Sequence, residues 1–263
     1  MPDSQKQIRQ VEAKALKHSE IAPGFFLLEL LTEEIAQAAL PGQFVMIRVS
    51  QGLAPLLRRP FSIHRVEGNS LSILYRVVGN GTRLLSRLKP GEGVDLVGPL
   101  GRGFSIPADA RTVVLVGGGI GIAPLGFLAE YIRSRMDRIR LVLYYGARSG
   151  GELLRLDILQ KLDMEMRLAT DDGSKGEKGM VTAILEQDMH NLSPALYCGC
   201  GPEPMLKALA RLPFTNADRV QVSLEANMAC GIGACLGCAV ETRSGYGHVC
   251  QDGPVFSLED LPW

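Results

Sequence analysis

Short apolar runs separated by turn residues dominate the chain from about residue 8 to residue 105. The runs are of strand length and include FFLLEL, QFVMIRV, FSIHRV, LSILYRVV and VDLVGPL. Between them stand breaks rich in glycine, such as EGN, GNG and PGEG. Apolar runs of this length, bounded by turn residues, are typical of antiparallel strands. The pattern predicts a small antiparallel β-barrel domain over residues 1–108.

The pattern of apolar runs changes between about residues 111 and 224. Here the apolar runs VVLV, LVLYYG, MRLAT, ALYC and VQVSL alternate with segments long enough to form helices. Strands that alternate with helices build parallel sheets with crossover connections. The pattern predicts a Rossmann-like, parallel-sheet nucleotide domain over residues 109–224. The expected fold class is therefore β plus α/β.

The last part of the chain, residues 225–263, has little periodicity and is dense in glycine and cysteine. A segment without a regular apolar pattern has little to bury. We therefore expect a bound metal centre, rather than apolar packing, to order this short C-terminal segment.

Composition and charge exclude several classes of function. The 263 residues are 46% hydrophobic, which is enough for a core in each of two domains. The 28 basic residues equal the 28 acidic ones, so no overall charge attracts nucleic acid or an anionic membrane. The start of the chain is polar, and no run approaches about 18 apolar residues. We expect a cytoplasmic protein whose six cysteines are reduced.

Four cysteines near the C-terminus form the most specific pattern in the chain. Four residues separate Cys230 from Cys235, two separate Cys235 from Cys238, and eleven separate Cys238 from Cys250. This is the spacing of a plant-type [2Fe–2S] loop, in which four thiolates hold two irons. Glycines within the loop let backbone N–H groups approach the bridging sulfides: Gly231, Gly233 and Gly237. The pattern predicts a [2Fe–2S] cluster.

A zinc site is the alternative for these cysteines. Common zinc sites favour two short cysteine pairs, whereas here three cysteines share one glycine-rich loop. His248 is not needed as a ligand, because four cysteines already complete the set, and we expect it at the surface. Cys198 and Cys200 stand on a different element, where each is interpreted as a small buried residue beside a nucleotide.

A glycine-rich turn lies at the start of the second domain. The segment VVLVGGGIGIAPLGFLAEYI predicts a strand, a turn and a helix, with Pro124 in the first helical turn. Such a turn directs backbone amides and a helix N-terminus toward a pyrophosphate. It differs from the dinucleotide fingerprint G-x-G-x-x-G, because Ile122 or Pro124 occupies the third glycine position. Alone, the turn is weak evidence for a nucleotide.

Later strand ends support the same interpretation. YYGAR, ATDDGS and YCGCGPEPM place glycine and polar residues at the carboxyl ends of successive strands, where open parallel sheets bind ligands. Each glycine alone could simply make a tight turn, but together they favour a nucleotide site. The preference between NAD and NADP stays open, because Arg148 could accept a 2′-phosphate while Asp171 and Asp172 would oppose one.

The barrel carries a third candidate site. LLRRPFSIHRV contains the pattern Arg59-x-Phe61-Ser62, and YRVVGNGTRLL places Gly81 and Thr82 about twenty residues later. Arg59 and Thr82 could hold phosphate oxygens while Phe61 lies against an aromatic ring. The alternative for Phe61 is a place in the barrel core.

Taken together, these motifs resemble the ferredoxin–NADP reductase superfamily, in which an R-x-[YF]-S strand binds flavin and a C-G-P-x-P-M turn lies near the nicotinamide. More narrowly, the chain is similar to the family of electron-transfer subunits of class 1B dihydroorotate dehydrogenases. The narrower resemblance rests on RRPFSI, YRVVGNGT, VGGGIGIAPL, GPEPML, SLEANMACGIGACLGCAVET and VCQDGPVF. It covers nearly the full length.

The resemblance implies three cofactors and their contacts. FAD would contact Arg59, Pro60, Phe61, Ser62, Leu74, Tyr75, Arg76, Gly81 and Thr82. The [2Fe–2S] ligands would be Cys230, Cys235, Cys238 and Cys250. The nicotinamide nucleotide, NAD by family resemblance, would meet Gly117, Gly118, Gly119, Gly121, Gly201, Pro202 and Met205. The terminal aromatic residue that stacks on flavin in plant-type reductases has no secure counterpart, and Trp263 is only a weak candidate.

The resemblance also implies a partner. Nicotinamide exchanges two electrons at once and a [2Fe–2S] cluster takes one, so a flavin is needed between them. The chain shows neither a further phosphate site for FMN nor a constellation for oxidising a carbon acid. The family implies an FMN-containing dihydroorotate dehydrogenase catalytic subunit as partner, in a heterotetramer with two copies of each chain, and no catalytic residues for dihydroorotate in this chain.

Other functions remain as alternatives. Similar subunits serve hydrogenases, sulfur reductases and transhydrogenase-like flavoproteins. Oxygenase reductases carry a full ferredoxin domain of about 90 residues, and the segment after Leu224 is too short for one. A regulatory module, with zinc on its cysteines and a nucleotide bound without turnover, is a hypothesis of another class, and it predicts a colourless protein.

Overall fold

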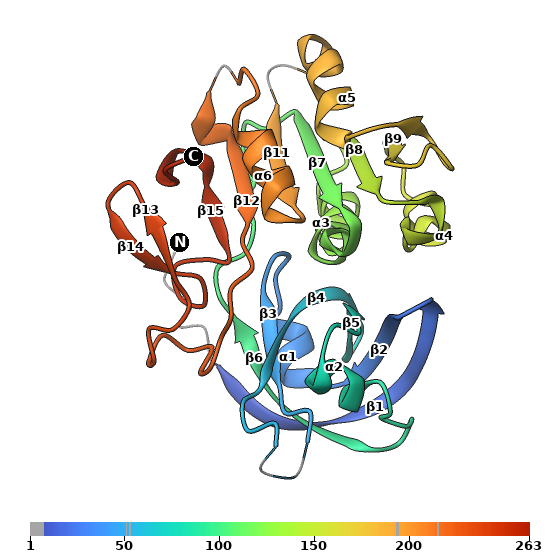
Figure 1. The fold of residues 1–263 in the computed structure, drawn as a ribbon, viewed down its shortest axis with the longest axis vertical. Coiled ribbons are helices and arrows are strands. Elements are labelled where there is room, and N and C mark those ends of the chain that lie inside the picture. Colours follow the sequence, from blue (N-terminus) through green and yellow to red (C-terminus); the bar gives the residue numbers. More distant parts are fainter. Residues whose placement is uncertain (1–7, 51, 53, 193–194, 215) are drawn as a thin grey trace.

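The structure of the protein is a computed structural model that describes residues 8–50, 52, 54–192, 195–214 and 216–263. A barrel and an open sheet lie one above the other, and the C-terminal segment lies beside both (Figure 1). This arrangement confirms the predicted fold class.

The barrel is closed and antiparallel, with strand order β1-β2-β5-β4-β3-β6. Its inner positions are apolar residues at every second position, as the short runs predict. Two short helices each bury an apolar side chain in the barrel core. The elements are β1 (Arg9–Ala22), β2 (Phe25–Leu31), α1 (Glu33–Ala38), β3 (Phe44–Ile47), β4 (Arg59–Glu67), β5 (Ser70–Arg76), α2 (Asn80–Leu85) and β6 (Gly93–Leu100).

The second sheet has seven strands in the order β10-β9-β8-β7-β11-β12-β15. Its first six strands are parallel, as predicted, and β15 joins β12 antiparallel. The strands are β7 (Thr112–Gly118), β8 (Arg140–Ala147), β9 (Glu165–Thr170), β10 (Glu177–Lys178), β11 (Leu196–Cys200), β12 (Val220–Ser223) and β15 (Val255–Ser257). The helices are α3 (Ile122–Arg135), α4 (Leu156–Leu159), α5 (Val181–Asp188) and α6 (Glu203–Ala210), and the 3-10 turns are η1 (Gly119–Gly121), η2 (Gly150–Glu152), η3 (Met189–Asn191) and η4 (Ala217–Arg219).

The C-terminal segment contains a hairpin, β13 (Ala239–Thr242) and β14 (Gly245–His248), followed by β15 and the 3-10 turn η5 (Leu258–Asp260). The expectation that apolar packing contributes little here was wrong for its second half. Phe256, Leu258 and Leu261 are buried in the same core as strands of the parallel sheet. The burial of these three side chains was not predicted, because they lie on one edge strand and one irregular turn, where apolar residues show no repeating period.

Helix α3 connects the two domains. It lies between the parallel sheet and the barrel and packs against β4 (Figure 1). Phe127 of α3 is buried in the barrel core, while Phe25 and Leu74 of the barrel are buried in the core of the nucleotide domain. The two cores exchange side chains, so the barrel and the sheet hold a defined relative position.

No helix among the described residues is long and apolar enough to cross a membrane.

Candidate functional site

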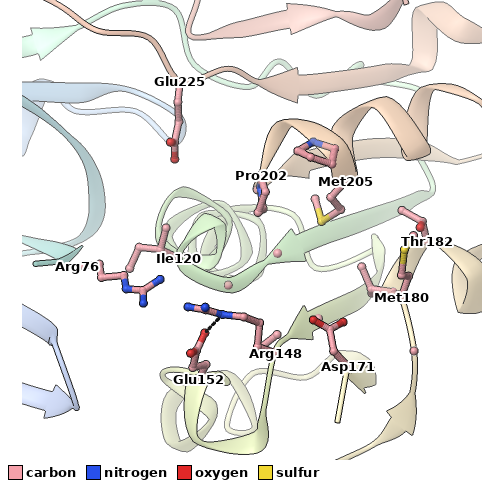
Figure 2. A pocket seen from close by; sticks show the side chains of 18 of the residues that line it. Arg76, Ile120, Arg148, Glu152, Asp171, Met180, Thr182, Pro202, Met205 and Glu225 are labelled. Atoms are coloured by element: carbon pink, nitrogen blue, oxygen red, sulfur yellow. Dashed lines mark hydrogen bonds and ion pairs between the residues drawn. The ribbon is translucent and has the colours of Figure 1, made fainter. Parts of the chain in front are cut away.

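A cavity of about 540 Å³ opens at the carboxyl edge of the parallel sheet, where the sheet faces the barrel (Figure 2). Open parallel sheets bind ligands at this edge. Six residues predicted from the sequence line it: Arg76, Gly118, Gly119, Gly201, Pro202 and Met205. One cavity therefore joins a predicted flavin contact with predicted nicotinamide contacts.

The glycine turn meets the loop after β11 at the floor of this cavity. A Cβ on Gly201 would lie 3.0 Å from the backbone nitrogen of Gly118, and a Cβ on Gly118 would lie 2.5 Å from the sulfur of Met205. Only glycine leaves room for these two loops to approach so closely. Gly121 lies behind the cavity, where a side chain would overlap the carbonyl of Cys200, and Gly117 is buried beneath it.

Charged side chains stand at opposite ends of the cavity (Figure 2). Arg148 follows β8, and its Nε lies 3.2 Å from a carboxylate oxygen of Glu152. Asp171 follows β9 and lines the same wall, whereas Asp172 accepts hydrogen bonds from Ser174. The cavity thus holds one arginine already paired with a carboxylate and a second carboxylate near it.

Glu225 lies at the other end, two residues after the last residue of β12, and its carboxylate points into the cavity (Figure 2). It keeps contact with solvent, but the surrounding walls desolvate it and raise its pKa. Phe25 and Arg76 form the barrel side of the cavity, with the Arg76 guanidinium 5.3 Å from the centre of the Phe25 ring.

The remaining predicted flavin contacts lie on the barrel, outside this cavity. Arg59 and Ser62 are on β4, and both keep some exposure. The Arg59 side chain lies against the start of α2, because a Cβ on Gly81 would be 2.9 Å from its Nε. Thr82 accepts the backbone N–H groups of Val78 and Gly79 through its hydroxyl. Arg59 and the loop at Gly81 and Thr82 are therefore neighbours, as phosphate contacts need to be.

Phe61 and Tyr75 have their side chains inside the barrel. Both belong to its core, and their rings pack edge to face with centroids 5.5 Å apart. The Tyr75 hydroxyl lies 2.9 Å from Nε2 of His18, and burial raises its pKa. The Phe61 ring therefore lies in the barrel core, and its contact with FAD stays a prediction.

The cysteine loop wraps around its own sulfurs. Backbone N–H groups of Ile232 and Cys235 donate to Sγ of Cys230, at 3.5 and 3.4 Å, and Gly233 donates to Sγ of Cys250 at 3.2 Å. Gly231, Gly233 and Leu236 have positive φ angles, which turn these N–H groups inward. N–H groups aimed at sulfur stabilise the negative charge of ligating thiolates, so the loop fits an iron–sulfur cluster.

The pKa values of two of the thiols, Cys230 and Cys250, fit a cationic centre. Burial opposes ionisation of Cys230, but the N–H donors of the loop lower its pKa to about 7. Burial, and then the adjacent Cys238, raise the pKa of Cys250 to about 12. Cys250 is therefore not easily a thiolate unless positive charge lies near it, and two irons would supply it. Among the described residues, no three His, Cys, Asp or Glu side chains are arranged around a single metal ion.

The cluster loop touches the barrel. A Cβ on Gly231 would lie 2.5 Å from the side chain of Met46, which is on β3. Met46 is the cross-strand partner of Pro60, within the predicted flavin strand. On its other side the loop exposes Ile232 and Leu236, at 50% and 59%. One side of the loop therefore faces the flavin strand and the other faces outward.

The sequence also drew attention to two further cysteines, one histidine and the terminal tryptophan. Cys198 and Cys200 are buried in β11, as expected, and burial raises the pKa of both thiols. His248 is half-buried rather than fully at the surface, because its backbone N–H and its ring lie near the Asp252 carboxylate. Trp263 lines a second cavity with Val240 and Lys207, and is not among the residues that line the first.

Comparison with known proteins gives the family. The model for the iron–sulfur cluster binding domain of dihydroorotate dehydrogenase B matches residues 225–262, and an oxidoreductase NAD-binding domain matches residues 115–211. The dihydroorotate dehydrogenase B (NAD(+)) electron transfer subunit of Desulforamulus reducens is 39% identical over 259 residues, covering 96% of this chain and 98% of that protein. The chain belongs to the family of dihydroorotate dehydrogenase B electron transfer subunits. The subunit from Caldanaerobacter subterraneus is also 39% identical, over 256 residues, and covers 96% of this chain and 98% of its own.

Solved structures agree with this family of electron transfer subunits. The NADH-dependent reduced ferredoxin-NADP oxidoreductase, studied for flavin-based electron bifurcation, matches with a TM-score of 0.85 and 29% identity, covering 96% of this chain and 90% of that one. A ferredoxin reductase of carbazole 1,9a-dioxygenase shares the fold, with a TM-score of 0.70, 22% identity, and coverage of 82% and 69%. The protein is an NAD-linked oxidoreductase subunit for electron transfer, with FAD, a [2Fe–2S] cluster and NAD as its cofactors. The match to the iron–sulfur domain favours the cluster over the zinc alternative.

Several residues of the cavity were not found from the sequence. Phe25, Glu152, Met180 and Glu225 line it, yet each stands outside a recognisable motif. They come from segments up to 200 residues apart in the chain, and only the docking of barrel on sheet brings them together. Glu225 had the best available clue, because it follows a predicted strand at the ligand-binding edge.

Proposed function

We propose that this chain transfers electrons between NAD(H) and an FMN-containing dihydroorotate dehydrogenase catalytic subunit, as part of pyrimidine biosynthesis. The observation that carries the proposal is the position of the cysteine loop. Its inner side packs on Met46, beside the flavin strand, and its outer side exposes Ile232 and Leu236. A loop placed in this way connects the interior of the chain with a partner.

The proposal assigns the cofactor contacts residue by residue. FAD is held by the outer face of the barrel, at Arg59, Pro60, Phe61, Ser62, Leu74, Tyr75, Arg76, Gly81 and Thr82. NAD is held in the cavity at the sheet edge and by the turn behind it, at Gly117, Gly118, Gly119, Gly121, Gly201, Pro202 and Met205. The cluster is held by Cys230, Cys235, Cys238 and Cys250.

The chain's own residues provide binding and orientation. FAD, when bound, exchanges two electrons with nicotinamide and single electrons with the cluster. Arg59 supplies a guanidinium for phosphate oxygens. Gly118 and Gly201 line the cavity with Arg76, and without side chains of their own they would leave room there for a nicotinamide ring. Oxidation of dihydroorotate itself belongs to the catalytic subunit.

The proposal extends to organisation and assembly. Residues 1–108 form the FAD domain, residues 109–224 the NAD domain and residues 225–263 the cluster segment. Ile232 and Leu236 contribute to the interface with the catalytic subunit, in a heterotetramer with two copies of each chain. We place the complex in the cytoplasm, where reducing conditions keep the cluster thiols available.

An anaerobic absorbance spectrum of the purified chain, before and after NADH, tests this function. We expect flavin bands, broad visible absorption from about two irons and two sulfides per chain, and bleaching by NADH. Dihydroorotate should bleach the chain only after the catalytic subunit is added. A colourless protein, or oxidation of dihydroorotate by this chain alone, would contradict the proposal.

A second candidate is a transhydrogenase-like subunit, favoured by the solved bifurcating oxidoreductase with 29% identity. The 39% identity to the Desulforamulus reducens subunit favours dihydroorotate dehydrogenase. Titration of the chain with the FMN-containing subunit separates the two. NADH formation from dihydroorotate and NAD⁺ upon mixing supports our proposal, and no transfer from dihydroorotate supports the second candidate.

A further inference from the structure

A β-bulge in strand β4 turns two consecutive side chains toward the nucleotide domain. Ile63 pairs with Ile73 of β5, but the next pair is Arg65 with Ser72, so His64 is an extra residue on β4. Side chains of a regular strand alternate between its two faces. The extra residue interrupts this alternation, so His64 and Arg65 both face outward, while Ile63 stays in the barrel core.

Both outward side chains reach the same helix. Nδ1 of His64 lies 3.0 Å from the carbonyl oxygen of Ala123, and Nε of Arg65 lies 3.0 Å from a carboxylate oxygen of Glu130. Ala123 and Glu130 are seven residues apart on α3, or about 10 Å along the helix axis. Two attachments at this separation fix both the rotation and the sliding of α3 along β4.

The helix is shaped to receive the histidine. Gly126 lies under the imidazole, and a Cβ there would be 3.1 Å from Cε1 of His64. Phe127, on the same face of α3, is buried in the barrel core. His64 itself is only 5% exposed. A buried imidazole whose Nδ1 meets a carbonyl donates its proton there, because the carbonyl can only accept.

The two ends of this contact belong to different cofactor sites. His64 is two residues after Ser62, on the strand proposed to hold FAD. Ala123 is two residues after Gly121, at the start of the helix that follows the proposed nicotinamide turn. The His64 side chain joins the two segments directly, through its hydrogen bond to Ala123.

We propose that His64 is a positioning residue for hydride transfer between nicotinamide and flavin, acting through its hydrogen bond to Ala123. The inference rests on the proposed function. His64 touches neither reacting ring. It sets the position of the glycine turn relative to the flavin strand, and hydride transfer is sensitive to that distance because a misplacement of about 1 Å can cost about 100-fold in rate.

Stopped-flow reduction of the FAD- and cluster-loaded chain, over a range of NADH concentrations up to saturation, tests the inference. His64→Leu should slow flavin reduction about tenfold or more, with a small change in KM, and should weaken the long-wavelength charge-transfer absorbance of reduced nicotinamide stacked on oxidised flavin. His64→Asn should recover most of the rate, because its amide Nδ2 occupies the place of Nδ1 and can donate to Ala123.

Gly126→Ala is a second, independent variant, since it keeps His64 and places a methyl group 3.1 Å from Cε1 of the imidazole, where His64 or α3 must shift. It should slow flavin reduction in the same way, and it keeps the test decisive if His64→Leu fails to fold. Wild-type rates and charge-transfer absorbance in His64→Leu, or equal slowing in His64→Leu and His64→Asn, would overturn the inference. If the wild-type chain itself is not reduced by NADH, the proposed function fails instead.

Discussion

The hydroxyl oxygen of Tyr145 lies 3.1 Å from the carbonyl oxygen of Gly119. The same hydroxyl accepts the backbone N–H of Leu154 at 2.9 Å and lies 3.3 Å from the carbonyl of Glu152. Tyr145 is fully buried on β8, and burial raises the pKa of its hydroxyl, which therefore stays protonated. One side chain thus connects the glycine turn to the segment that carries Glu152.

Replacing Tyr145 with phenylalanine removes this connection. The N–H of Leu154 loses its partner inside the protein, and an unpaired buried donor costs about 1–3 kcal/mol. We expect Tyr145→Phe to lower the free energy of unfolding by that amount and to raise the KM for NADH several-fold. Urea unfolding and NADH titration measure the two effects. Tyr246→Phe, at an exposed tyrosine, should change neither.

Acid should weaken the protein through His64. Burial lowers its pKa from 6.5 to about 4, against the opposing hydrogen bond to Ala123; Arg155 and Arg65 lower it further and Asp157 raises it. The unfolded chain binds a proton at about pH 6.5 and the folded chain does not until about pH 4. The contribution of neutral His64 to the free energy of unfolding is therefore complete above pH 6.5 and is lost as the pH falls toward 4.

At pH 5.5 the free energy of unfolding should be about 1.4 kcal/mol lower than at pH 7.5, because pH 5.5 is one unit below the pKa of His64 in the unfolded chain. Urea unfolding at both pH values measures it. In His64→Asn this share of the pH dependence should disappear, whereas replacement of His190, which is exposed, should preserve it. An unchanged pH dependence in His64→Asn would show that other groups are responsible.

The cluster should depend on Cys250 and not on Cys198. Cys250 receives the N–H of Gly233 in the cysteine loop, whereas Cys198 is buried in β11. Cys250→Ser should lose the broad visible absorption and most of the iron, while NADH still bleaches the flavin. Cys198→Ala should keep about two irons per chain. Iron loss in both variants would point to general instability rather than to ligation.

The sequence predicts most of the architecture because strand period and cysteine spacing are local properties. Strand β1 was missed, since its inner positions include Ala13 and Ala15, which give little apolar contrast against the charged residues between them. The bulge at His64 could not be predicted either, because one strand's pattern does not report the register of its partner. In the sequence, His64 therefore looked like part of an ordinary strand.

The preference for NAD should depend on the two carboxylates at one end of the cavity. Glu152 already pairs with Arg148, and Asp171 lines the same wall, so a 2′-phosphate there would meet two negative charges and an arginine already held by a carboxylate. Glu152→Gln together with Asp171→Asn should release Arg148 and remove the repulsion. We expect the ratio of kcat/KM for NADPH to that for NADH to rise at least tenfold, or about 1.4 kcal/mol.

Asp172 provides the matched control for this change of charge. Its carboxylate accepts hydrogen bonds from Ser174 and is not among the residues that line the cavity. Asp172→Asn removes the same charge one residue away and should leave the NADPH to NADH ratio within about two-fold, since exposed charges are screened by solvent and salt. Adding Arg148→Ala to the double variant should cancel its gain, because the released guanidinium is the group expected to bind the 2′-phosphate. An equal effect of Asp172→Asn would mean that overall charge, rather than this end of the cavity, selects the nucleotide.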